Sequence, residues 1–550
     1  MFSDSSSNCT ADFSVWKHLR RDFEPESLRF LGITPCETPD LRLARAFCKQ
    51  AAAIAVDIGR DPAEWFEVFS GISRIASASC GIRIPDHVKV GPDDIPGSTA
   101  FVILGAEHAI GNWRARFPVL VQVTSLEQAK SALAGGALGL IAKGQESGGL
   151  IGEESSFILL QRILELTADR KVPVWCQGGI GLHTAAGAIA GGAFGVVLDS
   201  QMALLAECSL PEEIKSDIAS MDGSETRLLG GYSVYSRPGL AVAEYAELSA
   251  SEARQLLADS ALLPVGQDAA LAKPLATQCA NTEGLLHALR MSVVGHIRQA
   301  TALKPLDENS PLAQAHGTRY PIAQGPMTRV SDTAEFACAV AENGALPFLA
   351  LSLMAEAQAR RLLEATRDSI GQHSWGVGVL GFAPPEILNP QLTLIQEFRP
   401  SVVLLAGGRP AQARALVEQG IPAYLHVPSP GLLSLFLKDG ARHFIFEGRE
   451  CGGHVGPRFS FVLWEQQIRL LLEFEHPEQL HLLFAGGIHD ERSAAMVAAI
   501  SAPLAARGAK IGILMGTAYI ATHEAVSCGA VNENFRRKII AGDATVLLET

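Results

Sequence analysis

The sequence contains an internal repeat, which constrains the fold more tightly than any other feature of the chain. Segments in the first half align with segments in the second half, and several of them are rich in glycine. The aligned pairs are 143–152 with 447–456, 156–160 with 460–464, 177–180 with 485–488, and 195–200 with 512–517. Because the pairs keep the same order in both halves, the chain is predicted to contain two homologous domains.

Each half alternates short apolar runs with amphipathic segments of helical length, such as Leu126–Ala134. The candidate strands of the first half are 28–33, 53–57, 81–84, 101–104, 118–123, 139–142, 173–177 and 195–198. Those of the second half are 320–324, 345–349, 376–380, 402–406, 422–426, 443–447, 481–485 and 512–515. This alternation is typical of βα units that close a parallel barrel. Some spacings in the first half are short, which leaves open whether its barrel is complete.

The alternation of strand and helix patterns is interrupted between the two halves. Helical patterns at 211–221, 250–258 and 283–300 are separated there by turn-rich pieces that contain glycine and proline. We therefore predict an α/β protein with two tandem TIM-type (β/α)8 barrels joined by a mostly helical connector. The predicted divisions are a polar N-terminal segment at 1–27, a first barrel at 28–207, the connector at 208–317 and a second barrel at 318–550. A length of 550 residues suits two barrels of roughly 200 to 250 residues each.

The apolar run at 545–550 ends the sequence without a polar tail. It indicates either a piece of a longer polypeptide or a natural C-terminal strand.

Charge and cysteine usage narrow the class of protein. The net charge of −13 argues against nucleic acid or an anionic membrane surface as the main partner. The 10 cysteines show no C-x-x-C pair and no Cys/His ligand spacing, which indicates a reducing compartment and no metal site. The polar start lacks the order of a signal peptide, and the most apolar long stretch, 182–205, is interrupted by His183 and Asp199. We expect a cytoplasmic enzyme without a membrane span.

Glycines follow the last two predicted strands of the second half. Gly486 and Gly487 come after the seventh strand, and Gly516 and Thr517 after the eighth. In a parallel barrel, the loops after the carboxyl ends of the strands form the active-site face. The loops after strands seven and eight commonly offer backbone N–H groups to a phosphate. The second half is therefore predicted to bind a phosphate-bearing cofactor.

The first half differs at these positions. Asp199 replaces Gly516, which would place a carboxylate beside a phosphate, and Leu150 replaces His454. The first half is therefore predicted to have lost both phosphate binding and proton chemistry. The alternative is that its cofactor sits differently and that Asp199 points away.

Four motifs of the second half resemble the nitronate monooxygenase (2-nitropropane dioxygenase) superfamily of FMN-binding TIM barrels. They are Pro-Ile-Ala-Gln-Gly-Pro-Met at 321–327, Glu-Cys-Gly-Gly-His-Val-Gly at 450–456, Ala-Gly-Gly-Ile at 485–488 and Met-Gly-Thr at 515–517. This superfamily also includes flavin-dependent enoyl-acyl carrier protein reductases and the enoyl reductases of polyunsaturated fatty acid synthases. The tandem form looks like the paired barrels inside type I polyketide synthases, and the resemblance covers 28–205 and 318–550.

The resemblance implies a set of site residues in the second half. The residues implied to line the isoalloxazine are Gln324, Gly325, Pro326 and Met327, and those implied to hold the FMN phosphate are Gly486, Gly487, Gly516 and Thr517. Gly452 and Gly453 allow close approach of the backbone to a flat ligand. Gly378 stands where many members carry an asparagine that contacts the flavin. His454 is implied to be the catalytic residue that faces the flavin and the substrate.

The favoured function is an FMN-dependent oxidoreductase, specifically an NAD(P)H-dependent enoyl-thioester reductase module of a polyketide or fatty acid synthase-like system. In this hypothesis NAD(P)H reduces FMN, hydride passes to the β-carbon of an α,β-unsaturated thioester, and His454 donates or relays a proton. The expected substrate is an acyl thioester on a carrier protein or coenzyme A, and other synthase domains are possible partners. The oligomeric state is left open.

Two other hypotheses remain. The enzyme alternative is a nitronate monooxygenase, which oxidises nitroalkanes with O2 and needs no nicotinamide. For the first barrel, the alternative is a non-catalytic scaffold that packs against the second barrel or docks a carrier protein.

Other ionisable residues near the motifs are weaker candidates for a functional role. Cys451 lacks a recognisable histidine base, so a nucleophilic role is disfavoured. His426 lies at the carboxyl end of the fifth predicted strand of the second half, on the predicted active face, and is a candidate substrate contact. Arg329 and Lys438 are further candidate ligand contacts.

Overall fold

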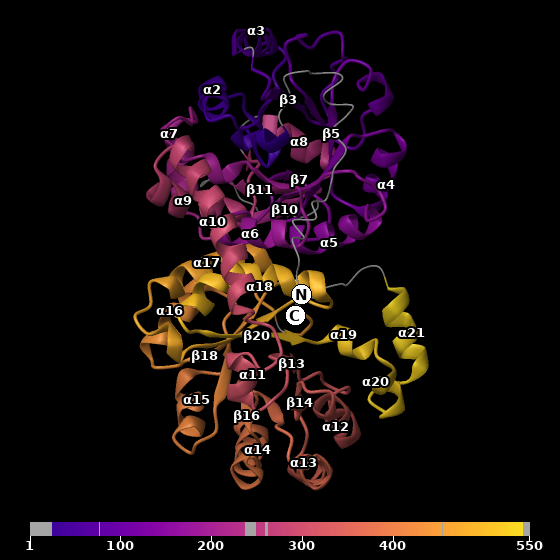
Figure 1. The fold of residues 1–550 in the computed structure, drawn as a ribbon, viewed down its shortest axis with the longest axis vertical. Coiled ribbons are helices and arrows are strands. Elements are labelled where there is room, and N and C mark those ends of the chain that lie inside the picture. The colour runs from indigo at the N-terminus through magenta and orange to yellow at the C-terminus, as the bar shows by residue number, and fades with distance from the viewer. Residues whose placement is uncertain (1–24, 76, 237–248, 259–261, 454, 543–550) are drawn as a thin grey trace. The chain divides into compact units, whose positions relative to one another are not determined.

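The computed structural model describes residues 25–75, 77–236, 249–258, 262–453 and 455–542. It divides into two compact units, Met1–Ile297 and Arg298–Thr550, and the boundary falls within helix α10 (Thr282–Leu303). Each unit contains a closed barrel of parallel strands, drawn in indigo to magenta for the first and in red through orange to yellow for the second (Figure 1). The predicted α/β fold with two tandem barrels is confirmed. The apolar run at 545–550 lies outside the described residues.

The first barrel is closed despite its short spacings. Its strands are β1 (Phe30–Ile33), β2 (Ile54–Asp57), β3 (Cys80–Ile84), β4 (Val102–Leu104), β5 (Val119–Val123), β6 (Gly139–Lys143), β8 (Val174–Gln177) and β9 (Gly195–Leu198). Closure occurs where β1 pairs with β9, with Gly32 opposite Leu198. The spacings are short because the connections between β3 and β5 contain only one short 3-10 helix, η3 (Ile110–Asn112). The other helices of this barrel are α2 (Leu41–Lys49), α3 (Trp65–Ile75), α4 (Leu126–Ala134), α5 (Ser156–Leu166) and α6 (Leu182–Ala190).

The second barrel follows the regular βα pattern. Its strands are β13 (Ile322–Gln324), β14 (Leu346–Ala350), β15 (Gly376–Leu380), β16 (Val402–Ala406), β17 (Ala423–His426), β18 (His443–Glu447), β19 (His481–Ala485) and β20 (Lys510–Met515). The helices are α11 (Pro311–His316), α12 (Ala334–Glu342), α13 (Glu356–Ser369), α14 (Pro385–Phe398), α15 (Pro410–Val417), α16 (Pro430–Lys438), α17 (Ser460–Leu472), α18 (Glu491–Ala506), α19 (Thr517–Ile520), α20 (His523–Ser527) and α21 (Glu533–Ala541). Pairing of β20 with β13 closes this barrel, with Met515 opposite Gln324.

Helix starts follow local capping chemistry in both barrels. The hydroxyl of Ser429 accepts a hydrogen bond from the backbone N–H of Leu432 at 3.3 Å, and Pro430 occupies the first turn of α16. Ser125 and Thr333 cap α4 and α12 in the same way. Such caps satisfy N–H groups that have no partner within the helix, so they fix where each helix begins after its strand.

The segment between the barrels contains helices and a small sheet. The helices before α10 are α7 (Glu212–Ser220), α8 (Ala250–Ala258) and α9 (Ala272–Cys279), and the strands are β10 (Thr226–Leu229), β11 (Tyr232–Ser236) and β12 (Leu262–Leu263). Strands β10 and β11 form a hairpin across Gly230 and Gly231, whose φ angles of 54° and 81° require glycine-like freedom. Strand β11 also pairs with β7 (Gly149–Leu150), which belongs to the loop after β6. The predicted mostly helical connector did not include this sheet.

Candidate functional site

The C-terminal end of each barrel is lined by the last inward-facing residues of its strands. Alternate residues of a strand face the same side of the sheet. The residue two places after a core residue therefore also points into the barrel, one layer closer to its C-terminal end. For example, Tyr424 and Ile445 belong to the apolar core of the second barrel, and His426 and Glu447 follow two places later on β17 and β18. We call this layer the mouth layer.

The strand registers show which mouth-layer residues of the two barrels are equivalent. Asp57 pairs with Arg83 in the first barrel, and Ala350 pairs with Gly378 in the second. Following the registers from strand to strand gives the equivalent pairs Asp57 and Ala350, Arg83 and Gly378, Gln122 and His426, Lys143 and Glu447, Gln177 and Ala485, and Asp199 and Gly516. The mouth layer is therefore strongly polar in the first barrel and consists mainly of small residues in the second.

A chain of hydrogen bonds crosses the mouth layer of the first barrel. The Asp57 carboxylate accepts from Arg83 Nη1 at 2.6 Å, and Arg83 Nε donates to Gln122 Oε1 at 3.0 Å. Gln122 Nε2 donates to Gln177 Oε1 at 2.7 Å, and Gln177 Nε2 donates to Asp199 Oδ2, also at 2.7 Å. Asp199 therefore points into the mouth, which corrects the alternative that it points away. These side chains occupy the space where a ligand of this barrel would bind.

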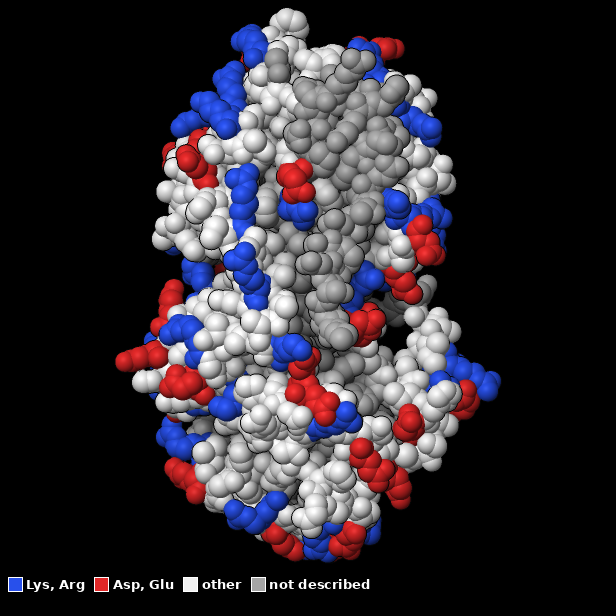
Figure 2. All heavy atoms as spheres, in the orientation of Figure 1, with Lys and Arg blue, Asp and Glu red and all other residues white. Residues whose placement is uncertain are grey.

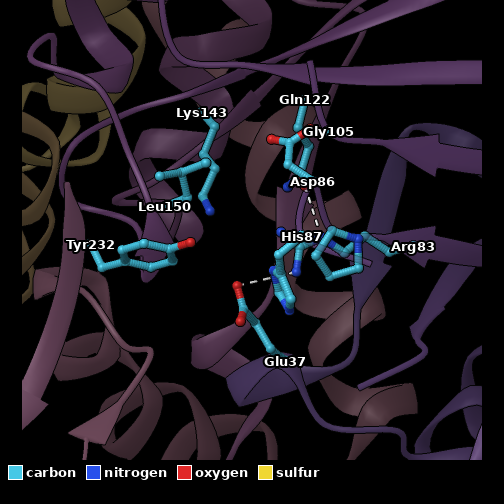
Figure 3. A pocket seen from close by; sticks show the side chains of 10 residues that line it. Glu37, Arg83, Asp86, His87, Gly105, Gln122, Lys143, Leu150 and Tyr232 are labelled. Carbon is cyan, nitrogen blue, oxygen red and sulfur yellow. Dashed lines mark hydrogen bonds and ion pairs between the residues drawn. The ribbon is translucent and has the colours of Figure 1, made fainter. Parts of the chain in front are cut away.

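A very small cavity lies in the mouth of the first barrel. It has a volume of about 30 Å³, and Lys143, Leu150 and Tyr232 face Arg83 and Glu37 across it (Figure 3). Burial alone would raise the pKa of Glu37, but nearby arginines and Lys143 outweigh it and hold that pKa well below its ordinary value. Burial, helped by Arg83, lowers the pKa of Lys143 to about 8. Ligand pockets usually measure roughly 300 to 1,000 Å³, so this cavity has room for about one water molecule.

The segment after the first barrel contributes to closing this mouth. Leu150 on β7 lies opposite Tyr232 on β11. Asp268 accepts a hydrogen bond from Ser200 Oγ at 2.8 Å, and its backbone N–H donates to the carbonyl of Glu146 at 3.2 Å. Burial and neighbouring carboxylates raise the pKa of Asp268. The polar network thus extends from the barrel into the segment that follows it.

The second barrel has small residues where this network would lie. At Gly378 an added Cβ would come within 2.4 Å of the Pro326 side chain, so Pro326 packs directly on that glycine. At Gly516 the nearest atom to an added Cβ is the Met327 sulfur at 3.7 Å. The side chains of Ala350 and Ala485 are single methyl groups. The space taken by Asp57, Arg83 and Asp199 in the first barrel is therefore not taken by the equivalent side chains here.

The structure brings most of the predicted flavin-lining residues together at β13, β15 and β20. Gln324 ends β13 and is buried, and its Nε2 donates to Ser331 Oγ at 2.7 Å. Ser331 Oγ also accepts from the backbone N–H of Met327 at 3.1 Å, while Gly325 N–H donates to the Met515 carbonyl at 2.9 Å. The turn at 324–327 is thereby held beside the end of β20. Sequence reasoning missed Ser331, whose role depends on the fold of this turn.

The predicted phosphate-binding residues follow the neighbouring strands β19 and β20. Gly486 and Gly487 have φ angles of 112° and 67°, close to the 116° and 64° of Gly178 and Gly179 in the first barrel. The loop after the seventh strand therefore keeps the same backbone shape in both barrels. Thr517 begins α19 immediately after Gly516. The two barrels differ after the eighth strand, where the first barrel has Asp199 and the second has Gly516.

The glycine-rich loop after β18 is anchored by Glu450. This carboxylate accepts hydrogen bonds from the backbone N–H of Ser460 at 2.9 Å and from its hydroxyl at 2.7 Å. Gly452 and Gly453 are exposed, with no atom within 4 Å of an added Cβ. His454, the predicted catalytic residue, lies outside the described residues.

Cys451, in the same loop, is not prepared as a nucleophile. Burial raises the pKa of its thiol, and the carboxylates of Glu447 and Glu450 raise it further. Because the thiolate is the reactive form, these surroundings disfavour attack by Cys451. An added Cβ at Gly486 would lie 3.1 Å from its sulfur, so the thiol packs beneath the loop after β19.

A groove with a volume of about 540 Å³ opens at the C-terminal ends of β16, β17 and β18. Its lining residues are Gly407, Gly408, Arg409, Pro410, Ala411, His426, Pro428, Leu432, Leu435, Phe436, Asp439 and Glu447. His426 Nδ1 lies 2.9 Å from Glu447 Oε2. The sequence indicated His426 but missed Glu447, although both end neighbouring predicted strands. Arg329 and Lys438 are exposed and do not line this groove.

Acidic and basic residues are interspersed among the described residues on the face drawn in Figure 2. No group of three or more His, Cys, Asp or Glu side chains in the described ranges is placed to hold a metal ion. Within the same ranges, every helix is too short or too polar to cross a membrane.

Residues 106–283 match the family model described as nitronate monooxygenase. Over this segment the chain is similar to the nitronate monooxygenase family. The matched segment runs from the end of the first barrel's β4 to the beginning of α10, and it ends before the second barrel begins. The nitronate monooxygenase match thus falls on the half with the filled mouth layer.

Several solved structures are similar to parts of this chain. A mutant of FabK from Thermotoga maritima is 27% identical and has a TM-score of 0.36, with 42% of this chain and 70% of that chain covered. A nitroalkane oxidase from Streptomyces ansochromogenes is 19% identical with a TM-score of 0.34, covering 41% and 72%. The enoyl reductase domain of MlnA from the macrolactin biosynthesis cluster of Bacillus amyloliquefaciens is 16% identical with a TM-score of 0.30, covering 40% and 57%. No curated protein matches the chain.

Proposed function

We propose that the second barrel is an FMN-dependent oxidoreductase that reduces α,β-unsaturated acyl thioesters with NAD(P)H. The observation that carries this proposal is the contrast between the two mouth layers. Arg83 and Asp199 take part in a hydrogen-bonded network in the first barrel, whereas Gly378 and Gly516 occupy their positions in the second. A flat cofactor needs such space at the C-terminal end of a barrel, because the loops there form the binding face.

The residues of the second barrel fit FMN. The turn at 324–327 would line the isoalloxazine, with Gln324 held by Ser331. The loops at 486–487 and 516–517 would hold the phosphate, and an added side chain at Gly516 would enter open space beside Met327. When bound, FMN supplies the redox chemistry, accepting hydride from a nicotinamide and delivering it to carbon.

The protein's part in this reaction is to bind, orient and supply a proton. Glu450 holds the loop that leads to Gly452 and Gly453 through its hydrogen bonds to Ser460. His454, which follows these glycines in the sequence, remains the candidate for proton donation because histidine titrates near neutral pH. We further propose that the acyl group arrives as a thioester of a carrier protein or coenzyme A, in the cytoplasm, within a polyketide or fatty acid synthase-like system.

The first barrel has a different role in this proposal. Its mouth layer is filled, and its cavity of about 30 Å³ is far smaller than a ligand pocket of roughly 300 Å³. We assign it a non-catalytic scaffold role, so that each chain binds a single FMN in the second barrel.

A second candidate function is nitronate monooxygenase activity, which is favoured by the family described for residues 106–283. That reaction consumes O2 with a nitroalkane and does not require NAD(P)H. Oxygen uptake measured with a nitroalkane, in the absence of nicotinamide, separates it from enoyl reduction.

The test begins with the absorbance spectrum of the purified chain and the amount of flavin released per chain. NADPH, or NADH in a parallel run, is then added without oxygen, followed by an enoyl thioester such as crotonyl-coenzyme A. One FMN per chain, bleached by the nicotinamide and reoxidised by the thioester, is the expected result. Two FMN per chain would refute the scaffold role of the first barrel, and absence of flavin would refute the whole proposal.

A further inference from the structure

We propose that the groove at the ends of β16, β17 and β18 binds the acyl thioester, with His426 donating a hydrogen bond to its carbonyl oxygen. Glu447 positions His426 in this arrangement, and Arg409 contacts the phosphate-bearing arm of the thioester. This inference rests on the proposed function and deepens it, because it names the residues that recognise the substrate.

The geometry places the pair where a ligand can reach it. His426 and Glu447 end neighbouring strands and face the barrel mouth, with Nδ1 and Oε2 separated by 2.9 Å. Their side chains are 16% and 11% exposed, so they are largely shielded from water yet open to the groove. Since Glu447 engages Nδ1, Nε2 is the ring atom left to contact a ligand.

The chemistry of the pair suits a developing negative charge. A carboxylate at Nδ1 orients the imidazole, and an imidazole that carries a proton on both nitrogens donates a hydrogen bond from Nε2–H. When hydride reaches the β-carbon of an enoyl thioester, negative charge builds on the carbonyl oxygen. A fixed donor in a shielded site stabilises that charge most effectively. This role consists of a hydrogen bond without transfer of a proton, so it needs no additional reactant.

The walls of the groove match an acyl chain. Leu432, Leu435 and Phe436 of α16 form an apolar wall, and Leu435 is 53% exposed. Next to the groove, Phe382 is 55% exposed and lies against the lining residue Gly407, where an added Cβ would be 2.6 Å from its ring. A volume of about 540 Å³ falls within the range of roughly 300 to 1,000 Å³ usual for small-molecule sites.

The charge at the entrance matches a phosphate. Arg409 precedes α15, is exposed, and has no ion-pair partner among the residues that the structure describes. Guanidinium groups bind phosphate well because they offer several donors in a fixed plane. Both coenzyme A and the prosthetic arm of a carrier protein present a phosphate at the end of an extended thioester. The two sources share this chemistry, and the test below distinguishes them.

The first barrel provides an internal contrast. Gln122 and Lys143 occupy the positions of His426 and Glu447, and both amide atoms of Gln122 are engaged in the mouth-layer network. The histidine–carboxylate pair therefore belongs specifically to the barrel with the larger opening.

The first experiment compares His426→Gln with His373→Gln, an exposed histidine outside the groove that serves as the matched control. We expect His426→Gln to slow reoxidation of the reduced protein by crotonyl-coenzyme A on the order of 10²-fold. FMN content and bleaching by NADPH should stay within about twofold, because this substitution leaves the predicted flavin contacts intact. Unchanged reoxidation in His426→Gln would overturn the role of His426 while leaving the proposed function standing.

A double variant separates a positioning role of Glu447 from a merely structural one. Because Glu447 lies 2.9 Å from Nδ1 of His426 and orients its ring, Glu447→Ala should slow reoxidation by crotonyl-coenzyme A with little change in FMN content. The double variant Glu447→Ala with His426→Gln should be no slower than His426→Gln alone, because Glu447 acts through His426. Losses that add in the double variant would refute the coupling between these residues.

Binding is measured independently of turnover with butyryl-coenzyme A, a saturated thioester that cannot be reduced. We expect Arg409→Gln to weaken the binding of butyryl-coenzyme A about tenfold relative to Arg361→Gln, an exposed control on α13. Leu435→Ser should weaken the binding of thioesters with longer acyl chains more than that of thioesters with short ones. Butyryl-pantetheine, which lacks the phosphate, should be insensitive to Arg409→Gln, and a butyryl carrier protein shows whether that source shares the site. Unaffected binding in both groove variants would overturn the proposal even if the protein fails to reduce any enoyl thioester.

Discussion

Arg83 and Gly378 occupy equivalent positions on the third strands of the two barrels. Arg83 donates to Asp57 at 2.6 Å and to Gln122 at 3.0 Å, and so ties adjacent and more distant strands together. Gly378 has no side chain, and Pro326 packs on it instead. At this position the first barrel has an arginine that joins the network filling its mouth. The second barrel has a glycine, which leaves its mouth open.

Introducing the first-barrel residue at Gly516 should impair flavin binding. Gly516→Asp adds a carboxylate beside the predicted phosphate site, and the nearest atom to its Cβ is 3.7 Å away, so the fold should tolerate it. We expect FMN affinity to fall at least tenfold, because two anions would be brought together without a counter-charge. The measurement is flavin retained after dialysis, with Gly516→Asn as the control for size. Equal retention by the Asp and Asn variants would contradict the predicted phosphate position.

Breaking the network in the first barrel should cost stability without reducing turnover. Arg83→Leu leaves Asp57 buried without its ion-pair partner, and removing one member of a buried pair typically costs about 3 to 5 kcal/mol. Urea unfolding of the first unit measures the loss in the free energy of unfolding. The double variant Asp57→Asn with Arg83→Leu should recover part of this loss, because it no longer buries an unpaired charge. Loss of activity in a folded Arg83→Leu protein would show that the first barrel participates in catalysis.

The glycine-rich loop allows a matched comparison between the barrels. Glu450 holds Ser460 in the second barrel, and Glu146 holds Ser156 in the same way in the first. We expect Glu450→Gln to lower the rate of thioester reduction on the order of tenfold through misplacement of the loop, and Glu146→Gln to leave it unchanged. Steady-state kinetics of the two variants, at equal flavin content, measure the difference. Equal effects would indicate a role in stability alone.

The sequence was sufficient to predict the barrels but not the contacts within their mouths. Strands of a parallel barrel are buried on both faces, so each one stands out as an apolar run. The hairpin of β10 and β11 was missed because its exposed Arg227 and Leu228 and short length give no such run. The mouth-layer network was missed because its partners are distant in the chain, as Arg83 and Gln122 are 39 residues apart. Only the strand registers show that these residues face each other.

The same limit applies to the histidines of the second barrel. His426 was recognised by its place at a strand end, but its partner Glu447 depends on the pairing of β17 with β18. His443 and His481 begin neighbouring strands, and their rings lie 4.2 Å apart at the opposite end of this barrel. Histidines of similar appearance in the sequence therefore belong to different environments.

The histidines at that opposite end should make stability depend on pH. Burial lowers the pKa of His316 and of His443 to about 4, and burial together with His443 lowers that of His481 to about 2. His316 Nε2 also lies 2.8 Å from the Tyr424 hydroxyl, which fixes its ring inside the barrel.

Because these pKa values are below the unfolded value of about 6.5, the unfolded chain binds more protons as the pH falls. The contribution of these groups to stability is therefore complete above about pH 6.5 and is lost progressively toward pH 4. We expect the denaturation midpoint of the second unit to decrease over that range, and His481→Leu to make the decrease shallower. The measurement is thermal or urea unfolding from pH 7.5 to pH 4.5, with the exposed His373→Gln variant as the control. A midpoint that is independent of pH across this interval would contradict burial of these histidines in their neutral form.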